Sequence, residues 1–184
     1  MDQALLITFH AEHAFAILSQ FAKLTRDAQC TVQRMRYRHL FDIQAGFYLV
    51  RGPWHQLEKV ELGLKLLEKP GVHLTLKRLD TAVDTPKPGY IPYWIGCNGP
   101  AEPDLLYHLT VFCKNKKIVL VECNAAEFTF PTTQATMLNL NAQALVPQNS
   151  ATRELRDQFF ELCDELNLDG IFEPERPQMF SGIL

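Results

Sequence analysis

The chain has 184 residues, 47% hydrophobic and 21% charged, a composition typical of folded globular proteins and unlike a disordered, collagen-like or coiled-coil chain. Its length allows one large domain or two small ones, since a domain commonly holds roughly 100–200 residues. Eighteen Lys and Arg against 21 Asp and Glu give a net charge of −3. This lacks the basic excess that drives non-specific DNA binding, so we expect no direct contact with nucleic acid.

The sequence also lacks signals for membranes, export and common catalytic chemistry. Its apolar runs are strand-sized, whereas a membrane helix needs about 20 apolar residues. Residues 1–3 carry no positively charged side chain, so we expect no secretory signal. We therefore expect the protein to be located in the cytoplasm. The five cysteines form no C-x-x-C pair, which predicts buried, reduced thiols. Glycine-rich nucleotide loops and a G-x-S-x-G motif are missing, so we expect neither a cofactor nor an enzyme.

The first half of the chain shows strand and helix patterns in the order β-α-β-β-α-β. Short apolar or alternating runs predict strands at residues 5–9, 30–37, 46–50 and 72–76. Apolar residues three or four apart predict helices around 17–24 and 57–67. Pro70 and Gly71 end the second helix, because proline cannot continue a helix and glycine suits its exit.

The second half repeats this order after a predicted linker at residues 81–90, which Pro86 and Pro88 stiffen. Strands are expected at 93–95, 118–122, 137–145 and 170–172, and helices around 105–113 and 155–166. Ser150 is the expected N-cap of the last helix. Residues 175–184 are expected to form a loosely held tail.

The two halves align at a constant offset of 88 residues, which pairs Ile17 with Leu105 and Val32 with Leu120. Later elements are offset further, and we assign the difference to an insertion at residues 125–136. The predicted fold class is therefore α+β. It consists of two tandem ferredoxin-like βαββαβ domains, 1–80 and 91–174, each an antiparallel sheet with helices on one face.

This repeated order resembles the ACT domain, a small regulatory fold of amino-acid metabolism. Over nearly the whole chain it is most similar to the tandem ACT-domain family of glycine cleavage system transcriptional repressors. Five segments carry the resemblance: Gln29–Val32, Gly52–Trp54, Leu74–Arg78, Phe130–Thr133 and Leu162–Asp169. It implies a non-enzymatic regulator of transcription that contacts a protein partner, such as a DNA-binding activator. It also implies glycine or another small amino acid as an effector. We expect exposed sheet faces or edges to pair within the chain, or between chains as a homo-oligomer.

The ACT ligand loop has the pattern G-x-D-R-P-G, which the first domain lacks, and of which the second keeps Gly99 and Pro103. The resemblance gives these candidate ligand-binding residues: His10, Glu12, His13, Thr31, Asn98, Gly99, Ala101, Glu102 and Asp104. Glycines let backbone N–H groups approach a ligand, and a helix N-terminus attracts its carboxylate. Glu102 and Asp104 would instead repel that carboxylate. The alternative is a scaffold that binds a protein partner and no ligand.

Three other groups have two interpretations each. The pair His10 and His13 with Glu12 is too small for a zinc site, so we expect a solvated loop and no metal. Cys97 with His108 has no orienting third group, so we expect a buried thiol rather than a nucleophile. Glu102 and Asp104 fit first-turn helix acids better than an acid–base pair.

Exposed-face patterns are also open to two interpretations. Arg34, Arg36 and Arg38 alternate along a predicted strand and form either a patch that binds an anion or a partner, or a solvated face paired to acidic neighbours. Trp54 and Trp94 are expected in core or interface packing rather than as ligand platforms.

Overall fold

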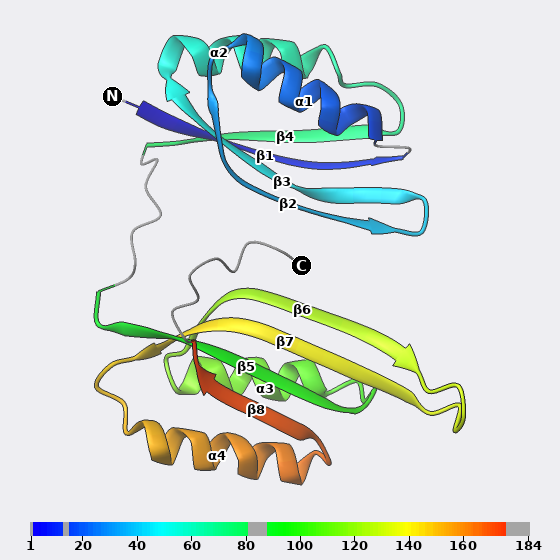
Figure 1. The fold of residues 1–184 in the computed structure, drawn as a ribbon, viewed down its shortest axis with the longest axis vertical. Helices are drawn as coiled ribbons and strands as arrows, with labels where there is room; N and C mark the ends of the chain where they lie inside the picture. Colours follow the sequence, from blue (N-terminus) through cyan, green and yellow to red (C-terminus); the bar gives the residue numbers. More distant parts are fainter. Residues whose placement is uncertain (1, 13–14, 81–87, 176–184) are drawn as a thin grey trace. The chain divides into compact units, whose positions relative to one another are not determined.

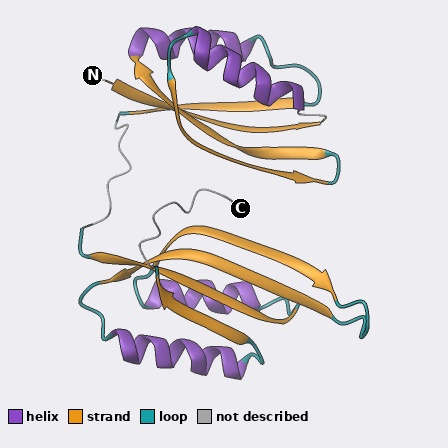
Figure 2. Ribbon diagram, viewed as in Figure 1, coloured by secondary structure: helices purple, strands orange, loops and turns teal. Residues whose placement is uncertain are grey.

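A computed structural model describes residues 2–12, 15–80 and 88–175, and the chain divides into two units, residues 1–85 and 86–184. Each unit is a four-stranded antiparallel sheet with two helices packed on one face (Figure 1, Figure 2). The predicted fold class, two tandem βαββαβ domains, is therefore confirmed.

Unit 1 has its strands in the spatial order β2-β3-β1-β4. Its elements are β1 (Asp2–Glu12), α1 (Phe15–Asp27), β2 (Thr31–Leu40), β3 (Ile43–Pro53), α2 (Trp54–Lys65) and β4 (Val72–Leu79). Alternate residues of β1, Leu5, Ile7 and Phe9, point toward the helices and are buried with Phe21 and Leu57. Every second residue of a strand faces the same side, so the intervening residues form the opposite face of the sheet.

Unit 2 repeats this layout in the order β6-β7-β5-β8. Its elements are β5 (Tyr90–Pro100), α3 (Leu105–Asn115), β6 (Val119–Thr129), β7 (Thr136–Pro147), α4 (Thr152–Glu165) and β8 (Asp169–Pro174). The core contains Ile95, Leu109, Leu140, Phe159 and Phe172. Phe159 is fully buried, with its ring centroid 5.5 Å from that of Phe172.

A β-bulge marks the same place in both repeats. The pairing of β2 with β3 skips one residue between Val32 and Arg34, and the pairing of β6 with β7 skips one between Leu120 and Glu122. The residues that the strand register skips, Gln33 and Val121, differ by the 88 positions inferred from the sequence. The repeat therefore extends to an irregularity of the edge strand, which periodicity did not predict.

Arg78 ties β4 to helix α2. Its guanidinium donates to both carboxylate oxygens of Glu61, at 2.6 and 3.1 Å, and lies 5.0 Å from the centroid of the Trp54 ring. A bidentate pair of this kind is among the stronger side-chain interactions in proteins. Both charged side chains are 24% exposed, so the pair is only partly screened by water. Trp54 itself is 54% exposed, so it lies outside the core, and its packing in an interface stays a prediction.

Two local predictions can be compared with the structure in detail. The insertion at residues 125–136 includes a longer hairpin turn: β6 continues to Thr129 and β7 begins at Thr136, so residues 130–135 connect them where Phe41 and Asp42 connect β2 and β3. Ala151, rather than Ser150, is the N-cap of α4, and no side chain caps it. The Ser150 carbonyl instead accepts a hydrogen bond from the Thr152 hydroxyl.

The predicted linker and tail fall largely outside the described residues, which exclude 81–87 and 176–184. The last residue assigned to the linker, Tyr90, is the first of β5. The first residue assigned to the tail, Glu175, donates its backbone N–H to the carbonyl of Pro92.

Candidate functional site

The unit 2 candidates lie together where β5 meets α3. Asn98 and Gly99 are near the end of β5, and Ala101, Glu102 and Asp104 form the connection to the helix. Asn98 is exposed on the face of the sheet opposite the helices, whereas Gly99 is buried. The structure thus gathers these five residues at one end of the sheet.

Gly99 is required by packing within the chain. A Cβ at this position would lie 2.3 Å from Cδ2 of Leu168, 2.9 Å from the carbonyl oxygen of Asn167 and 3.3 Å from Cα of Leu168. The turn between α4 and β8 therefore fills the space that a glycine could otherwise offer to a ligand. The close approach explains why this residue has no side chain.

Backbone donors of the same connection already have partners. The N–H of Ala101 donates to Thr136 at 3.2 Å, that of Glu102 to Pro100 at 2.9 Å and that of Leu105 to Glu102 at 3.2 Å. Helix α3 begins at Leu105 and has no acidic residue in its first turn, so Glu102 and Asp104 precede the helix rather than occupying that turn. Their exposed carboxylates stand beside its N-terminus, where they disfavour a second anion.

The unit 1 candidates lie at opposite ends of their sheet. His10 and Glu12 are near the end of β1, whereas Thr31 pairs with Arg51, which lies opposite Ala4. Ala4 and His10 are six positions apart on β1, about 20 Å at the usual rise of a strand. These residues therefore form no common site, and His13 lies outside the described residues.

Two features of unit 1 were not anticipated. The rings of His10 and His73 stack across β1 and β4, with centroids 4.4 Å apart. Gln44 on β3 is 4% exposed, and its Oε1 atom is buried with no hydrogen-bond partner. The alternation of Gln44 with Gly46, Tyr48 and Val50 could have marked it as a polar residue in phase with the core.

Three of the five cysteines, Cys97, Cys113 and Cys163, are buried. Burial raises the pKa of Cys97 and Cys113 to about 11 and that of Cys163 to about 12. These thiols stay protonated near neutral pH, which makes Cys97 unsuited to act as a nucleophile. Cys123 is exposed, contrary to the expectation that all five are buried. Among the described residues, no three His, Cys, Asp or Glu side chains are grouped to hold a metal ion.

The face of the unit 1 sheet opposite its helices is basic. The cross-strand register gives three of its rows as Arg34–Leu49–Leu6–Lys77, Arg36–Phe47–Thr8–Thr75 and Arg38–Ala45–His10–His73, and a further row, Leu40–Ile43–Glu12, adds one carboxylate. We call this surface the basic face. The predicted alternation of the three arginines is confirmed, and the register places them opposite Leu49, Phe47 and Ala45 on β3.

The corresponding face of unit 2 is acidic and rich in amides. Its rows are Glu122–Gln143–Trp94–Glu173, Asn124–Asn141–Gly96–Ile171 and Ala126–Asn139–Asn98–Asp169. We call this surface the acidic face. The Asn139 amide donates to Oδ1 of Asn98 at 2.8 Å, and the Asn141 amide donates to Asn139. Trp94 is 42% exposed here, outside the core of unit 2.

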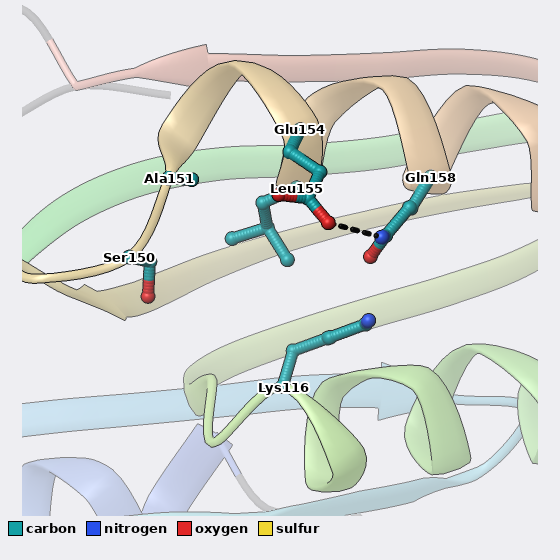
Figure 3. Close-up of a pocket in the computed structure, with 6 residues that line it drawn as sticks. All are labelled: Lys116, Ser150, Ala151, Glu154, Leu155 and Gln158. Atoms are coloured by element: carbon teal, nitrogen blue, oxygen red, sulfur yellow. Dashed lines mark hydrogen bonds between the residues drawn. The ribbon is translucent and has the colours of Figure 1, made fainter.

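A surface depression in unit 2 lies away from all of the predicted residues (Figure 3). It is lined by Lys116, Ser150, Ala151, Glu154, Leu155 and Gln158. Lys116 points from the end of α3 toward α4, on which Gln158 donates to Glu154 at 3.0 Å (Figure 3). The carboxylate of Glu154 offsets the positive charge of Lys116, so the depression has no strong preference for either sign of ligand.

Comparisons with known proteins place the fold. No protein-family model and no curated protein sequence match the chain. A crystal structure of a protein of unknown function from Galdieria sulphuraria is similar over 96% of this chain and 100% of its own, with a TM-score of 0.79 and 16% identity. A crystal structure of a proposed glycine cleavage system transcriptional repressor is similar over 96% of this chain and 99% of its own, with a TM-score of 0.70 and 19% identity.

At these identities the likeness concerns the fold, and function depends on the site. No helix among the described residues is both long and apolar enough to cross a membrane. The match to the proposed repressor over 96% of this chain shows that the two proteins share the tandem βαββαβ architecture along nearly the entire chain.

Proposed function

We propose that this chain is a non-enzymatic regulatory protein of the cytoplasm that acts on amino-acid catabolism genes by contacting a protein partner. The observation that carries this proposal is the two-unit match to a proposed glycine cleavage repressor, which covers 96% of this chain. Both units and their order are shared, so the likeness is to the whole architecture rather than to one common fold unit.

The geometry of the unit 2 loop supports contact with a protein over sensing of an amino acid at that loop. The space beside Gly99 is filled by Leu168, and three backbone donors of the connection are used within the chain. The two sheet faces, in contrast, present charged side chains in regular rows. Such surfaces suit a protein partner, because matched charges steer encounter and fix register.

A genetic experiment tests the regulatory role. Deleting the gene in its own organism should raise transcripts of glycine cleavage genes, and the wild-type gene should restore repression. Purified protein should not shift the corresponding promoter DNA, since the chain has a net charge of −3. Unchanged transcripts in the deletion strain would overturn the proposal, and a salt-sensitive DNA shift would replace protein contact by direct binding.

A second candidate function is amino-acid sensing in unit 1, and Gln44 is the observation that favours it. A buried acceptor without a partner costs about 1–3 kcal/mol, and Oε1 of Gln44 is such an acceptor. The ammonium group of a small amino acid would supply the missing donor. Among the described residues, neither the unit 2 candidates nor His10 and Thr31 have a buried side-chain polar atom that lacks a hydrogen-bond partner.

Thermal unfolding with millimolar glycine tests the second function. Binding to the folded state alone stabilises it by mass action, about 2.7 kcal/mol when the ligand stands at 100 times its Kd. Gln44→Met should abolish that increase while keeping the shape of the side chain. The exposed Gln148→Met serves as the control and should leave the response intact. If neither glycine nor any other amino acid changes the melting temperature of the wild-type protein, amino-acid sensing is excluded. The function that remains is then that of a scaffold that binds a protein partner.

A further inference from the structure

We propose that two copies of this chain associate face to face, with the basic face of unit 1 in one copy on the acidic face of unit 2 in the other. This contact uses the same two faces that suit a regulatory protein partner, so such a partner would bind them in competition with the second copy. A second copy of the chain is the partner, because every copy carries both of the surfaces that the contact requires.

The net charge of −3 conceals an opposition between the two halves. Residues 1–80 contain eleven basic residues (Lys and Arg) and eight acidic residues (Asp and Glu). Residues 81–184 contain seven basic residues and thirteen acidic residues. The halves therefore carry charges of +3 and −6. Complementary surfaces of this kind favour association and suppress contacts between like faces.

The opposition is sharpest in one pair of equivalent rows. In the basic face, Arg34 on β2 and Lys77 on β4 stand at the two ends of a row. In the acidic face, Glu122 on β6 and Glu173 on β8 stand at the ends of the corresponding row. Arg34 and Glu122 differ by 88 positions, so the repeat places opposite charges at equivalent points.

This arrangement tolerates either orientation of the two sheets. Both ends of the unit 1 row are basic and both ends of the unit 2 row are acidic, so each end meets an opposite charge in either direction. Both faces also have the same strand spacing of about 4.8 Å and the same rise of about 3.3 Å per residue. Rows of one face can therefore lie in step with rows of the other.

The middle of each row supplies apolar surface. Leu49 and Leu6 are half-buried between Arg34 and Lys77, and Trp94 is 42% exposed between Glu122 and Glu173. Stacked sheets pack about 10 Å apart through such side chains. Apolar side chains flanked by charges give the apolar centre and polar rim of a typical protein interface.

The available area is sufficient for a stable dimer. Four strands about 4.8 Å apart and about eight residues long cover about 500 Å² on one face. A symmetric dimer with two equal contacts uses four faces, and so buries about 2,000 Å², the upper part of the range for specific complexes.

Charge exchange between chains tests the proposal. We compare the full-length wild type, Arg34→Glu with Lys77→Glu, and Glu122→Lys with Glu173→Lys, by light scattering after size exclusion. Wild type should have twice the chain mass of 21.1 kDa. Each variant alone should have the mass of one chain, because both of its faces then carry the same sign at these rows. An equimolar mixture of the two variants should recover the double mass, which also shows that both are folded.

Matched controls reverse as many charges on the helices. Lys59→Glu with Lys65→Glu on α2, and Asp157→Lys with Glu161→Lys on α4, change exposed residues away from both faces and should keep the double mass. High salt should dissociate the wild-type dimer, since the Debye length shortens from about 8 Å at 0.15 M to about 3 Å at 1 M.

Three results would overturn the proposal. Wild type that stays at the single-chain mass at its highest soluble concentration excludes association of copies, even if faces pair within one chain. A dimer that both face variants retain assigns association to another surface. A mixture of the two variants that stays at the single-chain mass shows that these rows do not meet.

Discussion

Replacing Gly99 by alanine separates a packing role from a ligand-binding role for the loop between β5 and α3. The added Cβ would lie 2.3 Å from a methyl group of Leu168, which can rotate away. It would also lie 2.9 Å from the backbone oxygen of Asn167 and 3.3 Å from Cα of Leu168. Carbon contacts are normally about 3.5–4.0 Å, so the turn that leads into β8 must move.

Overpacking of this kind costs about 1–3 kcal/mol. For a unit of this size, each 1 kcal/mol lowers the melting temperature by about 4–8 °C. Gly99→Ala should therefore lower the unfolding temperature of unit 2 by several degrees in the absence of any ligand. Circular dichroism during heating, with and without millimolar glycine, measures both the intrinsic loss and any response to ligand.

Asn98→Ala is the matched control on the same strand. Its side chain is exposed and accepts one hydrogen bond from Asn139, so its loss should cost less than about 1 kcal/mol. The packing explanation is refuted if Gly99→Ala unfolds at the wild-type temperature and only the response to glycine is lost. That result would restore the loop as a ligand-binding site.

Three further predictions concern stability. Arg78→Met should lower the free energy of unfolding by about 1–2 kcal/mol through loss of its bidentate pair, whereas Arg26→Met, whose ion pair with the adjacent residue is exposed, should change it by less than about 0.5 kcal/mol; urea titration measures both. Burial raises the pKa of Cys163 from 9.0 to about 12, so the unfolded chain releases this proton first. The contribution of this group to the free energy of unfolding should therefore be constant below pH 9 and decrease as the pH rises toward 12. Cys163→Ala should reduce the dependence of the free energy of unfolding on pH in that range. Phe41 is 98% exposed at a φ of 57°, and Phe41→Asn should raise the melting temperature of unit 1 because asparagine tolerates this conformation better; an unchanged or lower value contradicts it.

Periodicity was sufficient to predict the architecture. Spacings of three and four residues placed Leu57, Val60 and Leu64 on the buried side of α2, and the structure confirms all three. The offset that pairs Val32 with Leu120 reflects equivalent positions in two sheets of the same strand order. These features depend on neighbours along the chain, which a sequence shows directly.

Features that depend on contacts between distant segments were not predictable in the same way. Gly99 lies in a segment whose sequence resembles a ligand-binding loop. Its packing role is evident only from the structure, which places Leu168 beside it. His10 and Thr31 are both polar and near loops in sequence, yet the pairing of β1 with β3 separates them. The total charge likewise gave no indication of two oppositely charged faces, because the register decides which side chains share a row.

The paired bulges at Gln33 and Val121 have a consequence for aggregation. Both lie in edge strands, β2 and β6, where free backbone groups would otherwise offer a regular template to a strand from another molecule. A bulge kinks the strand and strengthens its local twist, which breaks the flat ladder that stacked cross-β assemblies need. By duplicating the bulge with the fold, the repeat gives each sheet the same protection against fibril growth along this edge.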